Sequence, residues 1–128
     1  MVKTLLLGML FSMLGVIVGD PYDPNIVATK VRFGNLSAFD KSQGHTLAIV
    51  DSKKVYKEIS EYKIIIKENL KVGTARYSML IQKCTKKFRS ACQKLSTSKG
   101  YTLIVEVGGV GKYTPPDETS TLISLIGS

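Results

Sequence analysis

The sequence predicts an α+β fold in which a basic, antiparallel α-helical hairpin projects from a small β body. Residues 52–98 form the longest stretch with sustained helical periodicity, and they hold most of the positive charge. Short apolar runs typical of strands flank this stretch, at 46–50 before it and at 101–107 after it. The order strand, basic helical segment, strand therefore organises a chain of 128 residues, a length that suits one domain.

The N-terminal residues 1–19 have the pattern of a signal peptide. Lys3 provides a short positive start, residues 5–18 are mostly apolar, and Gly19 offers a small residue for cleavage. The apolar run is shorter than the ~20 residues that a spanning helix needs. An uncleaved anchor or a buried helix are the alternatives. Cleavage near Gly19 predicts a protein that works in the periplasm or is secreted.

Residues 20–45 read as a leader rich in prolines and turn-forming residues, with an edge strand within 26–33. The compact apolar run at 46–50 lies between Gly44 and Asp51, which predicts a buried strand. We expect residues 46–128 to form one domain with the order strand, helical hairpin, strand and short helix.

The second strand is predicted by alternation over 101–107. Leu103, Val105 and Val107 share one face with Tyr101, and Ile104 lies on the other. A glycine-rich turn follows at 108–111, and a short apolar helix is expected over 120–126.

The helical segment divides at Gly73 and Thr74. A glycine suits the end of one helix, and a threonine can cap the start of the next. The apolar stripe of the first helix is Val55, Ile59, Tyr62 and Ile66, and Asp51 or Ser52 can cap it. The second helix is expected over 75–98, with Tyr77, Leu80, Cys84, Phe88, Ala91 and Leu95 on one face. A single helix of nearly fifty residues is the alternative, because the stripe nearly keeps phase.

The positive charge is concentrated in the middle of the chain. Residues 53–99 carry thirteen Lys and Arg against three acidic residues, whereas 20–52 and 100–128 have formal charges of −1 and −2. This imbalance predicts an acidic partner. The candidate binding residues are Lys63, Lys67, Lys71, Arg76, Lys83, Lys86, Lys87 and Arg89, with apolar contacts from Tyr62, Ile64, Ile65 and Tyr77. Predicted export and the lack of an RNA-binding aromatic signature argue against nucleic acid.

The sequence predicts no catalytic residues, metal site or cofactor. The run at 108–112 is no phosphate-binding loop, because Glu106 replaces its first glycine and Tyr113 replaces its Ser or Thr. His45 lacks a poised nucleophile or carboxylate. Cys84 and Cys92 would lie ~12 Å apart along one helix, too far for a disulfide. We expect buried thiols there, with a non-helical local structure or intermolecular crosslinks as the alternatives.

The order of these pieces resembles the Skp/OmpH family of periplasmic chaperones. The opening strand and helix at 47–56, the return strand at 99–105 and the closing segment at 117–123 carry the resemblance. It implies a homotrimer whose strands form a β body and whose helical hairpins hold unfolded outer-membrane proteins. The chain resembles a short-armed variant, because each helix of about twenty residues reaches only ~30 Å.

The leading hypothesis is therefore an exported holdase chaperone that binds unfolded or acidic polypeptide through its basic hairpin, with Leu103, Val105 and Val107 in the subunit association. A secreted basic protein that binds an anionic membrane surface or polymer is the alternative from a different class. A structural subunit without chaperone activity is a further one.

Overall fold

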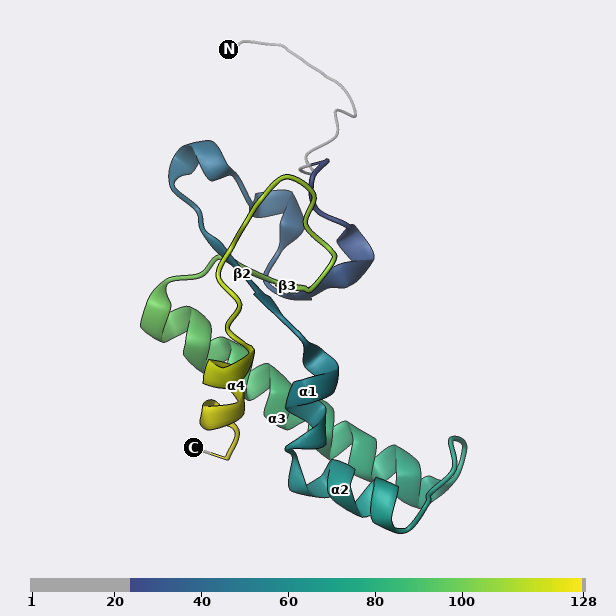
Figure 1. The fold of residues 1–128 in the computed structure, drawn as a ribbon. Coiled ribbons are helices and arrows are strands. Elements are labelled where there is room, and N and C mark those ends of the chain that lie inside the picture. The colour runs from purple at the N-terminus through teal and green to yellow at the C-terminus, as the bar shows by residue number, and fades with distance from the viewer. Residues whose placement is uncertain (1–23, 128) are drawn as a thin grey trace.

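The computed structural model describes residues 24–127 as an α+β fold, the predicted class. The predicted signal peptide, residues 1–19, lies outside the described residues. A three-stranded sheet has the order β1-β3-β2, with β1 at Val31–Phe33, β2 at Leu47–Val50 and β3 at Leu103–Glu106. Strands β2 and β3 are parallel, and β1 is antiparallel to β3. Figure 1 shows the helices on one side of this sheet.

The sheet is the middle of three layers, so β3 is buried on both faces. Ile104 points to the helical side, where it joins a core cluster with Val50, Val55, Phe88, Ala91, Cys92, Leu95 and Leu122. Leu103 and Val105 point to the other side, where Ile26, Leu36, Phe39 and Leu47 complete a second cluster. The predicted alternation of faces therefore holds, but neither face is open to solvent.

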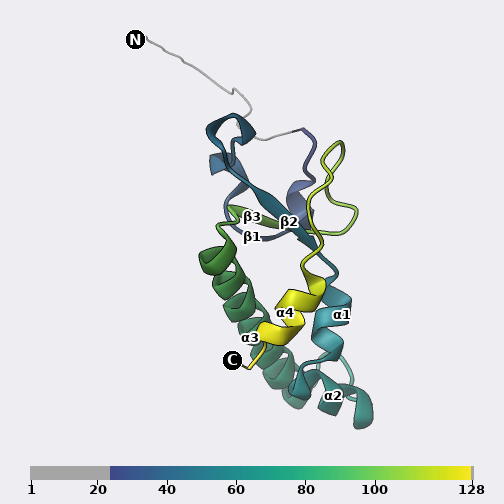
Figure 2. The same cartoon turned by 60° about the vertical axis from the view of Figure 1, so that its left-hand side comes forward.

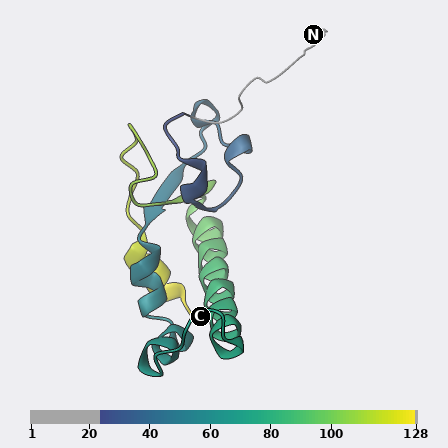
Figure 3. The same cartoon turned by 90° about the vertical axis from the view of Figure 1, so that its right-hand side faces the viewer.

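Three helices connect β2 to β3. These are α1 at Ser52–Lys57, α2 at Ser60–Lys67 and α3 at Ala75–Lys99. Figure 2 and Figure 3 show α1 and α2 running away from the sheet and α3 returning beside them. The short helix α4, Thr119–Leu125, packs against α1 and α3.

The starts and stops of these helices have local causes. Asp51 caps α1 by accepting a hydrogen bond from the Lys54 amide at 3.4 Å. The Thr74 hydroxyl accepts from the Tyr77 amide at 3.3 Å and starts α3. Gly100 ends α3 in the left-handed conformation with φ 77°, where a side chain would be strained.

The prediction of one continuous first helix was wrong. Ile59 has extended backbone angles, φ −84° and ψ 130°, and separates α1 from α2. This break shifts the helical phase, so Ile65 is buried and Ile66 is 65% exposed, the reverse of the predicted stripe. The Ile59 side chain is fully buried. The free energy gained by this burial offsets the cost of interrupting the helix.

The leader differs most from its prediction. The predicted edge strand within 26–33 is observed as β1, a 3-10 turn at Ala28–Lys30, and an isolated antiparallel bridge between Ile26 and Val110. The polar, turn-rich stretch after it contributes Leu36 and Phe39 to the core. This segment is therefore part of the folded body.

The leader also covers the side chains predicted for subunit association. Leu103 and Val105 have no exposed surface, because Ile26, Leu36 and Phe39 pack over them within one chain. Val107, just beyond β3, is 36% exposed. Association through Leu103 or Val105 would require the leader to leave the sheet.

Candidate functional site

Ion pairs within the helices account for part of the basic charge. Lys87 Nζ lies 2.8 Å from Glu61 Oε1, and Arg76 Nε lies 2.9 Å from Glu68 Oε1, so both pairs join α3 to α2 or to the residue after it. The hydrogen bond from Lys87 holds the pKa of Glu61 below its usual range, and Arg76 does the same for Glu68. Arg76 and Lys87 therefore help to hold the helices together, although both were predicted as binding residues.

Six of the other basic residues line two shallow depressions on the outer surface of the helices. The first, with a volume of about 400 Å³, we call the α2 depression; it is lined by Lys57, Tyr62, Lys63, Ile66 and Lys67. The second, of about 510 Å³, we call the α3 depression; it is lined by Met79, Ile81, Gln82, Lys83, Thr85, Lys86 and Arg89. Both combine basic side chains with apolar surface.

Exposed apolar side chains lie in each depression. Ile66 is 65% exposed in the α2 depression, and Met79 is 52% exposed in the α3 depression. The lysine stems also bring apolar surface to the rim, with the charged ends free to reach solvent. Such a surface can attract carboxylates and hold short apolar groups, but it offers no enclosed pocket for a small molecule.

The structure places the other six predicted binding residues in three settings. Lys63 and Lys67 line the α2 depression, and Lys83, Lys86 and Arg89 line the α3 depression. Lys63 also lies 3.7 Å from Glu58 in an exposed pair of little energetic weight. Lys71 lies in the connection before α3 and donates to the Asn69 side chain at 3.3 Å.

Of the predicted apolar helpers, Tyr62 lines the α2 depression, while Ile65 is buried in the core and cannot contact a partner. Tyr77 and Ile64 are half-buried. The sequence prediction missed Lys57 and Met79. Met79 has a recognisable signal, because it is a large apolar residue outside the buried stripe of its helix.

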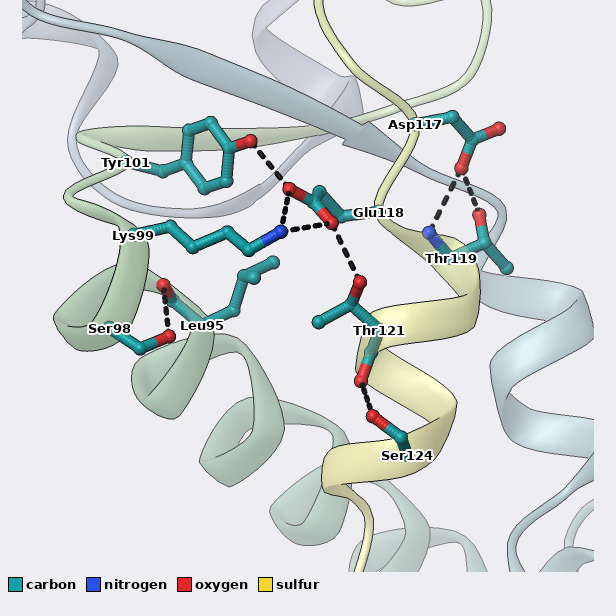
Figure 4. Close-up of polar contacts among 9 residues, drawn as sticks. All are labelled: Leu95, Ser98, Lys99, Tyr101, Asp117, Glu118, Thr119, Thr121 and Ser124. Atoms are coloured by element: carbon teal, nitrogen blue, oxygen red, sulfur yellow. Dashed lines mark hydrogen bonds and ion pairs between the residues drawn. The ribbon is translucent and has the colours of Figure 1, made fainter.

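A buried polar cluster joins α4 to the end of α3 (Figure 4). Glu118 accepts hydrogen bonds from the Tyr101 hydroxyl at 2.6 Å, from the Thr121 hydroxyl at 2.7 Å and from Lys99 Nζ at 3.0 Å. Burial opposes the ionisation of Glu118, but these hydrogen bonds outweigh it and lower its pKa. The carboxylate is fully used in these contacts, so the cluster fastens α4 in place and has no group poised for catalysis.

We expect Tyr101 to ionise at a higher pH than an unfolded tyrosine does. Burial and the hydrogen bond to Glu118 raise its pKa to about 12, above the value of about 10 for an unfolded tyrosine. The native state therefore holds the proton more tightly. The resulting stability is fully present below about pH 10 and is lost as the pH rises toward 12.

Ultraviolet titration of tyrosinate in the wild type and in Tyr101→Phe measures this. The wild type should show a tyrosinate step near pH 12 that the variant lacks. A step near pH 12 that persists in Tyr101→Phe would contradict the assignment.

The cysteines are free and buried in α3. Burial raises the pKa of Cys92 to about 12 and also raises that of Cys84, which keeps both thiols protonated at neutral pH. The Nδ1 of His45 accepts a hydrogen bond from the Asp40 amide at 2.9 Å. Among residues 24–127, no group of three or more His, Cys, Asp and Glu side chains is arranged to hold a metal ion.

No family model, curated protein sequence or solved structure matches this chain. No helix within the described part of the chain has both the length and the apolar character needed to cross a membrane. The two depressions and their charges are therefore the features of the molecule that bear on its function.

Proposed function

We propose that this protein binds unfolded or acidic polypeptide segments through the α2 and α3 depressions, as a holdase of the kind that the Skp/OmpH resemblance implies. The observation that carries the proposal is the pairing of basic side chains with exposed apolar ones in both depressions. Carboxylates on a client meet Lys67, Lys83, Lys86 and Arg89, while its apolar side chains meet Ile66 and Met79.

The energetics suit reversible holding. One exposed ion pair contributes only ~0.2–1 kcal/mol. Fully burying an aliphatic side chain contributes ~1.5–3 kcal/mol, and Ile66 has about two thirds of its surface available for this. Several contacts must therefore act together, and none of them fixes the structure of the client. That is the behaviour expected of a surface that keeps non-native chains soluble.

The proposal includes the architecture that the resemblance implies. In it, α1, α2 and α3 serve as a short arm, the protein associates as a homotrimer, and it acts in the periplasm or after secretion. The burial of Leu103 and Val105 by the leader restricts how such a trimer can form. Measuring the solution mass tests this part independently of client binding.

Aggregation of an unfolded outer-membrane protein tests the function. We expect the wild type to suppress light scattering at stoichiometric excess, and Lys67→Gln with Lys83→Gln to need about fivefold more protein for the same effect. The matched control is Lys30→Gln with Lys112→Gln, which removes equal charge from exposed positions of the body. The lack of any suppression by the wild type would contradict the proposal.

A second function is favoured by one observation. Val72, in the connection between α2 and α3, is 82% exposed and follows Lys71 directly. A protruding aliphatic residue beside lysines suits the surface of an anionic bilayer, where each nearby lysine contributes about 1 kcal/mol. Salt-sensitive binding to anionic vesicles, with no effect on client aggregation, would favour this function over the first.

A further inference from the structure

A groove of about 480 Å³ lies where the sheet meets the outer side of α3. One wall is β1 and the glycine that follows it, residues 31–34. The other wall is the exposed side of α3, with Arg89, Ser90 and Gln93. Figure 2 shows β1 above the end of α3 that adjoins the sheet. The groove is therefore separate from the α2 depression, and it shares only Arg89 with the α3 depression.

The two edges of the sheet differ in how they are covered. At the β2 edge, the Ile49 amide donates to the Pro116 carbonyl and the Glu118 amide donates to the Ile49 carbonyl, both at 2.9 Å. At the other edge, β1 pairs with β3 and with no further strand among residues 24–127. An edge strand presents backbone N–H and C=O groups that can pair with another extended chain. That edge belongs to the strand that lines the groove, and of its amides Val31 already donates to the Ala28 carbonyl.

Two guanidinium groups line the same groove. Arg32 is held by Glu106 through Nε at 3.0 Å and by the Thr29 carbonyl through Nη1 at 3.2 Å. Within the described chain, its Nη2 makes no hydrogen bond, and Arg89 makes neither a hydrogen bond nor an ion pair. Guanidinium groups favour carboxylates, with which they form paired hydrogen bonds. The groove thus combines a strand edge with a preference for negative charge.

We propose that this groove binds an extended acidic polypeptide segment, which adds to β1 as a further strand and directs a carboxylate toward Arg32 and Arg89. Main-chain hydrogen bonds supply sequence-independent affinity in this mode, and side chains at the wall supply selectivity. The inference rests on the proposed function, because an unfolded client is the source of such a segment. The short edge and the register irregularity between Val31 and Phe33 make the pairing weak and limit self-association.

A labelled peptide of about eight residues with alternating valine and glutamate is the probe. We expect it to bind the wild-type protein in a fluorescence anisotropy titration. N-methylation of its central amides should weaken binding about tenfold, because it removes the main-chain donors and keeps every charge. Replacing its glutamates with lysines should abolish binding. In amide NMR spectra, the largest shifts are expected at residues 31–34 and 89–93.

Two matched serine variants of α3 separate the groove from the rest of the helix. Ser90→Trp fills the groove without changing charge, and it should weaken peptide binding at least about tenfold. Ser78→Trp places the same side chain at an exposed position outside the groove and should leave binding unchanged. Circular dichroism confirms that both variants are folded.

Equal affinity for the N-methylated peptide, unchanged affinity in Ser90→Trp, or shifts confined to 63–83 would each overturn the groove proposal. Those outcomes leave the proposed function intact if the wild type still suppresses aggregation. Conversely, peptide pairing at β1 without aggregation suppression would overturn the holdase function and support the groove.

Discussion

Replacing Phe88 with alanine is expected to lower the free energy of unfolding by about 4 kcal/mol. Phe88 is 4% exposed in the cluster on the helical side of the sheet, and its ring lies 5.3 Å from that of Tyr56. Truncation removes the transfer energy of a large aromatic side chain and leaves a cavity between α1 and α3. Urea denaturation followed by circular dichroism measures the change.

A control on the same helix distinguishes this loss from an effect on helix propensity. Met79→Ala truncates a side chain that is 52% exposed, and it should change stability by at most about 0.5 kcal/mol. Equal destabilisation by the two substitutions would show that α3 does not pack through the face assigned to Phe88. The difference between the variants is therefore more informative than either value alone.

Replacing Glu106 with alanine is the second change with a large expected effect, about 3 kcal/mol of lost stability. The Glu106 carboxylate lies 3.0 Å from Arg32 Nε and accepts a hydrogen bond from the Ser52 amide at 3.0 Å. One side chain at the end of β3 therefore pairs with β1 and caps the first turn of α1. Alanine would leave a part-buried guanidinium and an orphan helix amide.

The conservative variant Glu106→Gln separates these two roles. Its amide oxygen can still accept from the Ser52 amide, but the charge opposite Arg32 is lost, so the expected cost falls to about 1 kcal/mol. Thermal unfolding of both variants at neutral pH tests the ranking. If Glu106→Ala were as stable as the wild type, the contacts of Glu106 with Arg32 and Ser52 would contribute nothing to the stability of the fold.

Local signals explain the parts of the fold that the sequence predicted. The Thr74 cap, the Gly100 stop and the regular apolar stripe between them act within a few residues of each other, so α3 was predicted within a residue at either end. The return strand was likewise visible from its alternation, and the observed β3 is its central part. In each case the residues that decide the structure are neighbours in the sequence.

Long-range packing explains what the sequence did not predict. Ile59 adopts an extended conformation that lets its side chain be buried in the core. No glycine or proline stands at this position to indicate a helix break. Leu36 and Phe39 sit in a polar segment without periodicity, yet they cover a strand more than sixty positions later. For the candidate site, the charge excess pointed to the segment whose helices carry both depressions. Which basic residues pair with Glu61 and Glu68 depends on how α2 and α3 are aligned.

The central place of β3 has a consequence for the time course of folding. Its parallel partner β2 lies 56 positions earlier in the chain, and the antiparallel pair of Val31 with Val105 spans 74. No strand pair of this sheet can form until the ribosome has released residue 103 and those that follow. Contacts of such high order slow folding, so the nascent chain spends its synthesis without a sheet. A chain that stays unfolded throughout its synthesis remains accessible to chaperones, proteases and export machinery that act on unfolded polypeptides.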